Sequence, residues 1–420
     1  MSDTVFFPHE ILLEILRRLP PQTLLRFTTV CKSWRSLITH PSFISLHYRH
    51  SPSFLLLQFS NRFVLPHRHP STTLCLPSFP HLDFPVVSFC NGLVCVAYGD
   101  QCQTVIVCNP CIRRFVTLPA PLEYPCYYTS NVVLGFDPSK CDYKVVRISC
   151  MVDDERFGLS APDVEVCSLA TGSWRTLDHG IAPICYLAGD SPHGFHDGLV
   201  HWVAKRCVAG GWYNFVLSFH FEGEMFREVM LPESLSGAST DAVMIKVVGG
   251  GNGKTLNVYH VGGGSPCSCD IWVMKEYGEV ESWNKVFSFV MSGFCLEAPS
   301  LGMMLSDVEI PPMELCVTCS GEVLLLVDVA GRRCLYSLDI EMKSFTDLQI
   351  EVDTEFVYSG YYAESLLLLN IASGVVSYWR GNDIPIRYLC VIFYLSCLCV
   401  LSSHFVAFSM GVKPFQVQGV

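Results

Sequence analysis

The feature of this 420-residue sequence that most constrains its fold is a β-strand pattern that recurs five times. In each copy, a strand of alternating apolar residues leads through a polar turn to a returning strand, which an aromatic residue opens. The aromatic residue lies ten positions after the start of the first strand in four copies and twelve positions after it in the remaining copy. Separated by 59, 52, 57 and 62 positions, these residues are Phe115, Trp174, Phe226, Trp283 and Phe345. The regularity indicates one structural unit copied along the chain.

A further strand, opened by glycine, precedes most of these hairpins. The glycines are Gly92, Gly198, Gly253 and Gly321. A single small sheet cannot bury its face alone, so such units stack radially and protect one another's edges. The repeat therefore predicts a β-propeller with five recognisable blades, and we expect residues 54–59 and 356–370 to supply the remaining strands and close the ring. A β-sandwich is the alternative, although it does not predict an aromatic residue at so constant an offset.

The N-terminal stretch, residues 7–46, has helical rather than strand periodicity. The first predicted helix carries one apolar stripe, formed by Ile11, Leu12, Ile15, Leu16 and Leu19. Pro20 and Pro21 end it, because proline lacks the backbone N–H and restricts the residue before it. Two more short helices follow, with apolar faces at residues 24–30 and 34–38. About forty residues are too few to bury this much apolar surface, which predicts that part of it contacts a partner.

The order of residues in this stretch resembles an F-box. The resemblance rests on Pro8, Glu10-Ile11-Leu12, Ile15-Leu16-x-x-Leu19-Pro20, Leu24-Leu25-Arg26-Phe27 and Val30-Cys31-Lys32-x-Trp34-Arg35-x-Leu37-Ile38, with Phe7 where a leucine is usual. It implies an adaptor that binds the Skp subunit of an SCF (Skp-cullin-F-box) ubiquitin ligase. The residues at the family's Skp-binding positions are Pro8, Leu12, Leu16, Val30, Cys31 and Trp34.

The strand-rich region resembles the F-box-associated domain of plant F-box proteins. Matching segments include residues 109–119, 135–146 and 164–174, and the most specific is Ile271-Trp272-Val273-Met274-Lys275-Glu276-Tyr277-Gly278. One departure is Cys108, which stands where the family commonly has tryptophan. The chain thus resembles a plant-type F-box protein with a C-terminal F-box-associated domain, which implies a kelch-like β-propeller.

These patterns predict a fold in two parts, a small all-α, three-helix F-box followed by a large all-β domain. We expect the F-box at residues 4–46 and a connector with candidate first strands at residues 47–85. The propeller-like domain is expected at residues 86–380, and an apolar C-terminal extension of unknown role at residues 381–420.

Charge and cysteine content narrow the function further. The net charge is −11, and residues beyond position 50 include 36 acidic and only 22 basic side chains, which argues against nucleic-acid binding. The 22 cysteines lie in apolar strand patterns, no secretory segment or Asn-x-Ser/Thr sequon is present, and free thiols in a reducing compartment are expected. We therefore expect the protein in the cytoplasm, the nucleus or both.

Several motifs resemble nucleotide-binding or metal-binding sites but lack features that such sites require. Residues 249–255 read Gly-Gly-Gly-Asn-Gly-Lys-Thr, but the glycine required earlier in a phosphate loop is Val248, and a strand rather than a helix is predicted to follow. The Cys-x-x-Cys pairs Cys108/Cys111 and Cys316/Cys319 lie about two hundred positions apart, and Cys267 and Cys269 form a third cluster. His201, near His193 and His196, lies in a repeat strand, which favours a core or rim histidine. No catalytic residue, cofactor or metal site is predicted.

Residues 388–410 form an apolar segment that contains no Asp, Glu, Lys or Arg. The segment is long enough to span a membrane, but Ser402, Ser403 and His404 reduce its apolar character. The alternatives are a final strand with a buried extension, a tail outside the working protein, or a membrane tether.

The resemblance to F-box proteins implies a non-catalytic substrate adaptor in the ubiquitin pathway for protein degradation. In this interpretation, the F-box binds Skp on a cullin scaffold and the propeller recruits a protein substrate whose identity the sequence leaves open. Two other interpretations stay open at this point: a ligand- or glycan-binding propeller with a non-functional F-box, and a propeller enzyme.

Overall fold

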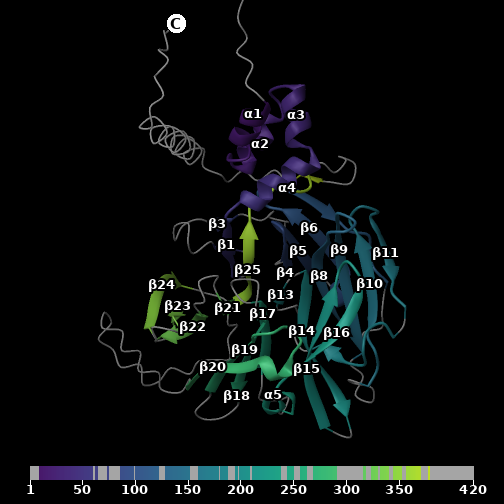
Figure 1. Ribbon diagram of the computed structural model, residues 1–420, viewed down its shortest axis with the longest axis vertical. Coiled ribbons are helices and arrows are strands. Elements are labelled where there is room, and N and C mark those ends of the chain that lie inside the picture. The colour runs from purple at the N-terminus through teal and green to yellow at the C-terminus, as the bar shows by residue number, and fades with distance from the viewer. Residues whose placement is uncertain are drawn as a thin grey trace, which may run out of the picture.

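The computed structural model describes residues 9–59, 62–64, 73–74, 86–98, 100–122, 128–151, 159–178, 180–187, 194–196, 198–208, 211–237, 244–249, 256–262, 268–290, 316–317, 323–329, 332–339, 344–351, 356–369 and 377–378. Four short helices come first and strands follow. Figure 1 shows these helices at one end of the molecule, above the sheets.

The N-terminal helices are α1 (His9–Leu16), α2 (Pro21–Phe27), α3 (Lys32–Ile38) and α4 (Pro41–His50). Pro21 and Pro41 each begin a helix, at the position where the missing N–H of proline leaves no bond unmade. The first three helices match the prediction. The fourth was missed, because residues from His47 onward were interpreted as connector, whereas α4 continues to His50 and buries Phe43, Ile44 and His47.

The strands of the described residues form six antiparallel sheets. The first sheet joins β25 (Phe356–Ala363), β1 (Ser53–Phe59), β2 (Arg62–Val64) and β3 (Thr73–Leu74), and the second joins β26 (Ser377–Tyr378), β7 (Arg114–Thr117), β6 (Thr104–Asn109), β5 (Leu93–Tyr98) and β4 (Val86–Cys90). The third contains β11 (Ser173–Thr176), β10 (Asp163–Ser168), β9 (Asp142–Met151) and β8 (Tyr128–Asp137).

The remaining sheets follow in chain order. The fourth contains β12 (Tyr186–Leu187), β13 (Gly194–His196), β14 (Leu199–Val208), β15 (Gly211–His220) and β16 (Met225–Met230), and a short helix α5 (Glu233–Ser236) follows it. The fifth contains β17 (Met244–Gly249), β18 (Leu256–Gly262), β19 (Ser268–Met274) and β20 (Trp283–Val290), and the sixth β21 (Cys316–Val317), β22 (Val323–Val329), β23 (Arg332–Asp339) and β24 (Ser344–Glu351). Two 3-10 turns, η1 (Asp100–Cys102) and η2 (Val280–Ser282), lie between strands.

The two ends of the strand-rich region meet in one sheet. Strand β1 pairs with β25 from Ser53 opposite Ala363 to Phe59 opposite Phe356, and β26 adds to the outer edge of β7. Both terminal segments expected to close the ring therefore do so by pairing with each other. The propeller-like arrangement is confirmed, and the two stacked sheets of a sandwich are not what the chain forms.

The recurring aromatic residues occupy one register position in their sheets. Each lies opposite the last or the last but one residue of the preceding strand: Phe115 opposite Cys108, Trp174 opposite Cys167, Phe226 opposite Phe219, Trp283 opposite Met274 and Phe345 opposite Leu338. The longer offset at Trp283 has a local cause, since η2 is inserted into that turn.

The two tryptophans at this position tie neighbouring sheets together. Trp174 Nε1 donates to the carbonyl of Pro119 at 2.7 Å, and Trp283 Nε1 donates to the carbonyl of Met230 at 2.9 Å. Pro119 lies in the Leu-Pro step after β7, and Met230 ends β16 directly before a second Leu-Pro step at residues 231–232. Two of the five recurring aromatic residues thus make the same kind of contact with the preceding sheet.

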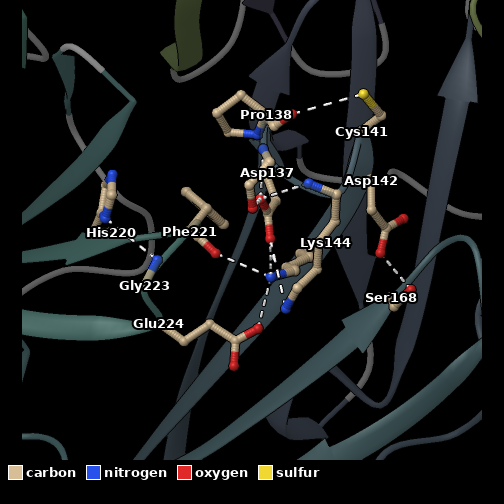
Figure 2. A network of polar contacts seen from close by, with 12 residues as sticks. Asp137, Pro138, Cys141, Asp142, Lys144, Ser168, His220, Phe221, Gly223 and Glu224 are labelled. Carbon is tan, nitrogen blue, oxygen red and sulfur yellow. Dashed lines mark hydrogen bonds and ion pairs between the residues drawn. The ribbon is translucent and has the colours of Figure 1, made fainter.

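Buried ion pairs also link the sheets. Lys144 on β9 lies between Asp137 and Glu224, with Nζ 2.5 Å and 2.7 Å from their carboxylates, and donates to the carbonyl of Phe221 at 3.0 Å (Figure 2). Asp137 is the last residue of β8 in the third sheet, and Glu224 lies in the β15–β16 turn of the fourth sheet. Burial acts to raise the pKa of Asp137, but hydrogen bonds from the Lys144 amine, the Ser139 hydroxyl and the Lys140 backbone N–H lower it to about 2. This carboxylate is therefore charged at neutral pH.

Candidate partner-binding site

Helix α1 divides its apolar stripe between solvent and core. Ile11 and Ile15 are 47% and 45% exposed, whereas Leu16 is 1% exposed. At about 100° per residue, Ile11 and Ile15 lie at one edge of the stripe, Leu16 lies at the other edge about 140° away, and Leu12 lies between. The half-buried state of Leu12 fits that geometry. The helix thus presents one isoleucine edge to solvent and buries the opposite one.

The turn between α2 and α3 carries another exposed apolar residue. Val30 is 61% exposed, the largest fraction among the exposed large apolar residues described. Cys31 caps α3, since its Sγ accepts a hydrogen bond from the Trp34 backbone N–H at 3.5 Å. Ser33 and that N–H lower the pKa of the exposed Cys31 thiol. The Trp34 ring packs against Phe27 with centroids 5.2 Å apart, which fixes α3 on α2 while leaving the tryptophan partly exposed.

The structure sorts the six residues expected to contact Skp. Val30 and Cys31 are exposed, Leu12 and Trp34 are half-buried, and Pro8 lies outside the described residues. Leu16 requires a correction, because its side chain lies in the core and leaves almost no surface for a partner. Ile11 and Ile15 were not among the six, but their side chains are exposed on α1. Their i, i+4 spacing at one edge of an overly wide stripe was the available signal.

Charged residues fix the end of α1. Glu14 pairs with Arg17 and Arg18, each at 2.5 Å, and these hydrogen bonds lower the pKa of Glu14 to about 2. Arg17 also donates to His50 Nε2 on α4 at 2.7 Å. These contacts connect the first and last helices, and the helical spacing places Glu14 and Arg18 directly beside the isoleucine edge.

The helices share a core with the propeller, which we call the seam. It contains Leu16, Leu24, Ile38, Phe43 and Ile44 from the helices and Ile112, Leu366 and Leu369 from the propeller. Because a bundle of this size cannot fill its own core, the propeller supplies the missing apolar contacts. The seam therefore sets the direction in which the exposed face of α1 points.

Hydrogen bonds hold the propeller side of the seam in place. Asn109 Nδ2 donates to the carbonyls of Ser365 and Leu367 at 3.0 and 2.9 Å, and Arg114 donates to those of Leu368 and Leu369 at 2.7 and 2.9 Å. The Asn-Pro-x-x-Arg-Arg motif thus anchors the segment after β25. The sequence identified these residues only through their resemblance to the family, and the structure shows that they have a structural role.

The described cysteine and histidine residues that suggested metal binding include Cys108, Cys111 and His201, which are buried. Burial raises the pKa of the Cys108 thiol to about 12. His201 is fully buried, and its Nε2 lies 2.8 Å from the Tyr277 hydroxyl, in agreement with the predicted core role. In the part of the chain that the structure describes, no three His, Cys, Asp or Glu side chains gather as a metal site.

Other predictions concern residues that the structure does not describe. These residues are His193, Cys267, Cys319, residues 250–255 of the glycine-rich loop and residues 388–410 of the apolar tail. The strand expected after the loop is present as β18. Among the described residues, no helix has the length and apolar character needed to cross a membrane.

Comparisons with known proteins agree with this division of the chain. Residues 7–46 match the F-box domain, and residues 46–367 match the family described as F-box associated beta propeller domain. The matched propeller follows the F-box directly and ends before the C-terminus, so the expected C-terminal placement was inexact. The matching family is described as an F-box associated propeller and not as a kelch domain, so the term kelch-like was also inexact.

Similar proteins come from Arabidopsis thaliana. F-box/kelch-repeat protein At3g17530 is 26% identical over 298 residues, covering 66% of this chain and 74% of that one. F-box protein At3g07870 is 26% identical over 388 residues, covering 81% and 87%. Among solved structures, TolB from Acinetobacter baumannii aligns over 76% of this chain and 70% of its own with 7% identity and a TM-score of 0.40, too low to carry an argument. The family match covers most of the sequence, and the chain belongs to the family of F-box proteins with an F-box associated β-propeller domain.

Proposed function

We propose that this protein is the substrate-recognition adaptor of an SCF ubiquitin ligase. Its F-box binds the Skp subunit on a cullin scaffold, and its propeller recruits a protein substrate for ubiquitination. The chain itself makes no bond, and its contribution is the proximity and orientation of the substrate. The free thiols among the described cysteines support a site of action in the cytoplasm or nucleus.

The observation that carries the proposal is the exposed apolar face of the F-box. Ile11, Ile15 and Val30 are each at least 45% exposed, whereas Leu16, Leu24 and Ile38 of the same helical region are buried. Exposed apolar side chains grouped on one face of a small domain are typical of a protein interface. We assign this face, with Leu12, Cys31 and Trp34 beside it, to Skp.

The seam supports the second half of the proposal. A ligase adaptor must hold its substrate at a defined place relative to the ligase, and a flexible joint between the two domains would blur that placement. Here Leu366 and Leu369 of the propeller are buried among the F-box helices. A Skp subunit bound to α1 would therefore have a fixed position relative to the propeller.

Co-expression with Skp and cullin tests the adaptor role. The wild-type chain is expected to co-purify with both, and the double variant Ile11→Asp, Ile15→Asp is expected to lose them. Val286→Asp is the matched control, because Val286 on β20 is 47% exposed and lies outside the F-box. The proposal is wrong if the wild-type chain captures no Skp, or if the double variant captures as much as the control. A second variant pair, Leu12→Asp with Trp34→Ala, tests the remainder of the face.

A further inference from the structure

The last described strand runs toward the F-box. Strand β26 pairs antiparallel with β7, with Ser377 opposite Phe115 and Tyr378 opposite Arg114. Because the two strands run in opposite directions, the chain leaves Tyr378 in the direction of the β6–β7 turn, residues 110–113. The sequence that follows Tyr378 therefore starts from that turn.

The β6–β7 turn lies against the F-box helices. Ile112 in this turn is buried and shares the seam with Leu16 of α1. Arg114, which lies opposite Tyr378, donates to the carbonyl of Leu369, another seam residue, at 2.9 Å. The described chain thus ends beside the helices, whereas α5 marks the opposite end of the molecule (Figure 1).

The sequence beyond Tyr378 contains a strongly apolar stretch. Residues 389–395, which we call the tail segment, read Leu-Cys-Val-Ile-Phe-Tyr-Leu and lie in a run without Asp, Glu, Lys or Arg. The segment begins eleven positions after Tyr378, and eleven residues can span up to about 36 Å. A helix of seven to ten residues, such as α2 or α4, is only about 10–15 Å long. The tail segment can therefore reach any face of the helical bundle.

Helix α1 presents an apolar surface that suits such a segment. Ile11 and Ile15, one helical turn apart, are 47% and 45% exposed and form the isoleucine edge. Covering this edge with apolar side chains removes apolar surface from water, which is favourable. The charged neighbours Glu14 and Arg18 already pair with each other at 2.5 Å. An uncharged segment can therefore cover the edge without leaving either charge unpaired.

We propose that the tail segment of this chain binds the isoleucine edge of α1 and so covers the face that the proposed function assigns to Skp. Attachment through a short stretch of chain gives the segment an effective concentration in the millimolar range, so that even a weak contact is populated. If about nine in ten chains hold the segment on α1, Skp binds about tenfold more weakly than to the uncovered face. The identity of the competitor rests on the proposed function, whereas the docking rests on the isoleucine edge, the direction of β26 and the composition of the tail segment.

Photo-cross-linking in the purified full chain tests the docking without Skp. A benzoylphenylalanine in place of Tyr394 is irradiated, and mass spectrometry of tryptic peptides locates the cross-link. We expect it in the peptide that ends at Arg17, which contains both isoleucines, within a product of monomer size. Ile11→Asp, Ile15→Asp is expected to lower its yield by about tenfold or more, and the control Val286→Asp to leave it unchanged.

Four results would overturn the docking. Cross-links confined to other peptides would place the tail segment elsewhere, and a product of dimer size would assign the contact to a second copy of the chain. Flotation of the chain with phosphatidylcholine vesicles, together with loss of the α1 cross-link, would assign the segment to a membrane. Equal yields from the α1 variant and from Val286→Asp would show that the isoleucine edge is not the binding surface.

Titration with purified Skp measures the competition. The variant Ile392→Asp, Phe393→Asp is expected to bind Skp about tenfold tighter than the wild-type chain, because the competing segment no longer covers α1. Ser402→Asp, Ser403→Asp is the matched control, since it adds the same two charges outside the tail segment and should bind Skp as the wild type does. A cross-link to α1 without any gain in Skp affinity would contradict the competition.

The two experiments separate this inference from the proposed function. If neither the wild-type chain nor the Ile392→Asp, Phe393→Asp variant binds Skp while the α1 cross-link forms, the adaptor role fails and the docking stands. If Skp binds both chains equally and no α1 cross-link forms, the docking is wrong and the adaptor role stands.

Discussion

The F-box helices and the propeller differ in how they place apolar and charged side chains. The helices expose Ile11, Ile15 and Val30 and borrow core residues from outside their own sequence range. The propeller buries even its charges, as in the pair of Arg147 and Glu165, which are 0% and 1% exposed. The exposed apolar side chains of the helices support the proposed Skp-binding face. The buried charges of the propeller are paired internally, which gives them a structural role.

The sharpest test of the propeller's side of this comparison is its buried pair. Arg147 Nη1 lies 2.7 Å from Glu165 and from the carbonyl of Leu122, and Nη2 lies 2.9 Å from the carbonyl of Gln101. Arg147→Met leaves the carboxylate buried without its cation, which is expected to cost about 3–5 kcal/mol of unfolding free energy. Denaturant titration measures this loss.

A matched variant shows whether burial is the cause. Arg206 pairs with Glu228 in a similar bidentate way, but the two side chains are 23% and 25% exposed. Arg206→Met is expected to cost only about 1 kcal/mol or less from the lost ion pair. Equal losses for the two variants would contradict the claim that the propeller depends on its buried charges.

The seam offers the next largest effect. Leu366 is fully buried between the helices and the propeller, and Leu366→Ala is expected to destabilise the protein by about 2–5 kcal/mol. Because the helices share this core, hydrogen exchange of amides in α2 and α3 should accelerate although the change lies more than three hundred residues away.

Leu134→Ala is the control for the seam. Leu134 is equally buried but lies in a propeller cluster without helix residues. Its loss of global stability should be similar, with less added exchange in α2 and α3. If both variants raise helix exchange equally, the seam is not a local contact and the helices simply follow global unfolding.

A smaller effect is expected where the third and fourth sheets touch. A Cβ added to Gly135 would lie 2.1 Å from Cζ of Phe221, so the ring would have to move. Gly135→Ala is expected to cost about 1–3 kcal/mol by overpacking. The second change Phe221→Leu should restore part of this loss in thermal unfolding. A double variant that is no more stable than the sum of its single changes would contradict a steric cause.

The weakest expected effect is a pH dependence at His47, whose ring lies beside the seam residue Phe43. Burial lowers the pKa of His47, whose Nε2 donates to the carbonyl of Leu19 at 2.8 Å. The unfolded chain therefore binds a proton at this site more readily, and stability should fall as pH falls through the ordinary histidine pKa of about 6.5. His47→Gln should lose less stability than the wild type between pH 7.5 and 5.5. A larger loss in the variant would reverse the assigned sign.

The sequence predicted those parts of the fold that local contacts determine. The aromatic offset follows from hairpin register, so Trp174 and Phe226 marked their strands without knowledge of the rest of the chain. Helix α4 was missed because its buried face is brief, and only packing against distant residues decides that Phe43 and His47 are internal. Composition alone made that stretch resemble a connector.

The candidate site was only partly predictable for the same reason. Periodicity found the apolar stripe of α1, but the edge that faces inward is decided by Leu366 and Leu369 at the far end of the chain. Local pattern therefore could not separate Ile11 from Leu16.

The central claim is that the exposed helix face, and not the propeller, binds Skp. Titration calorimetry of purified Skp with the wild-type chain, with Ile11→Asp, Ile15→Asp and with Val286→Asp tests it most directly. We expect the double variant to bind at least about a hundredfold more weakly, as the loss of two central apolar contacts implies, and the control to bind as the wild type does. Equal affinity for all three chains would contradict the account.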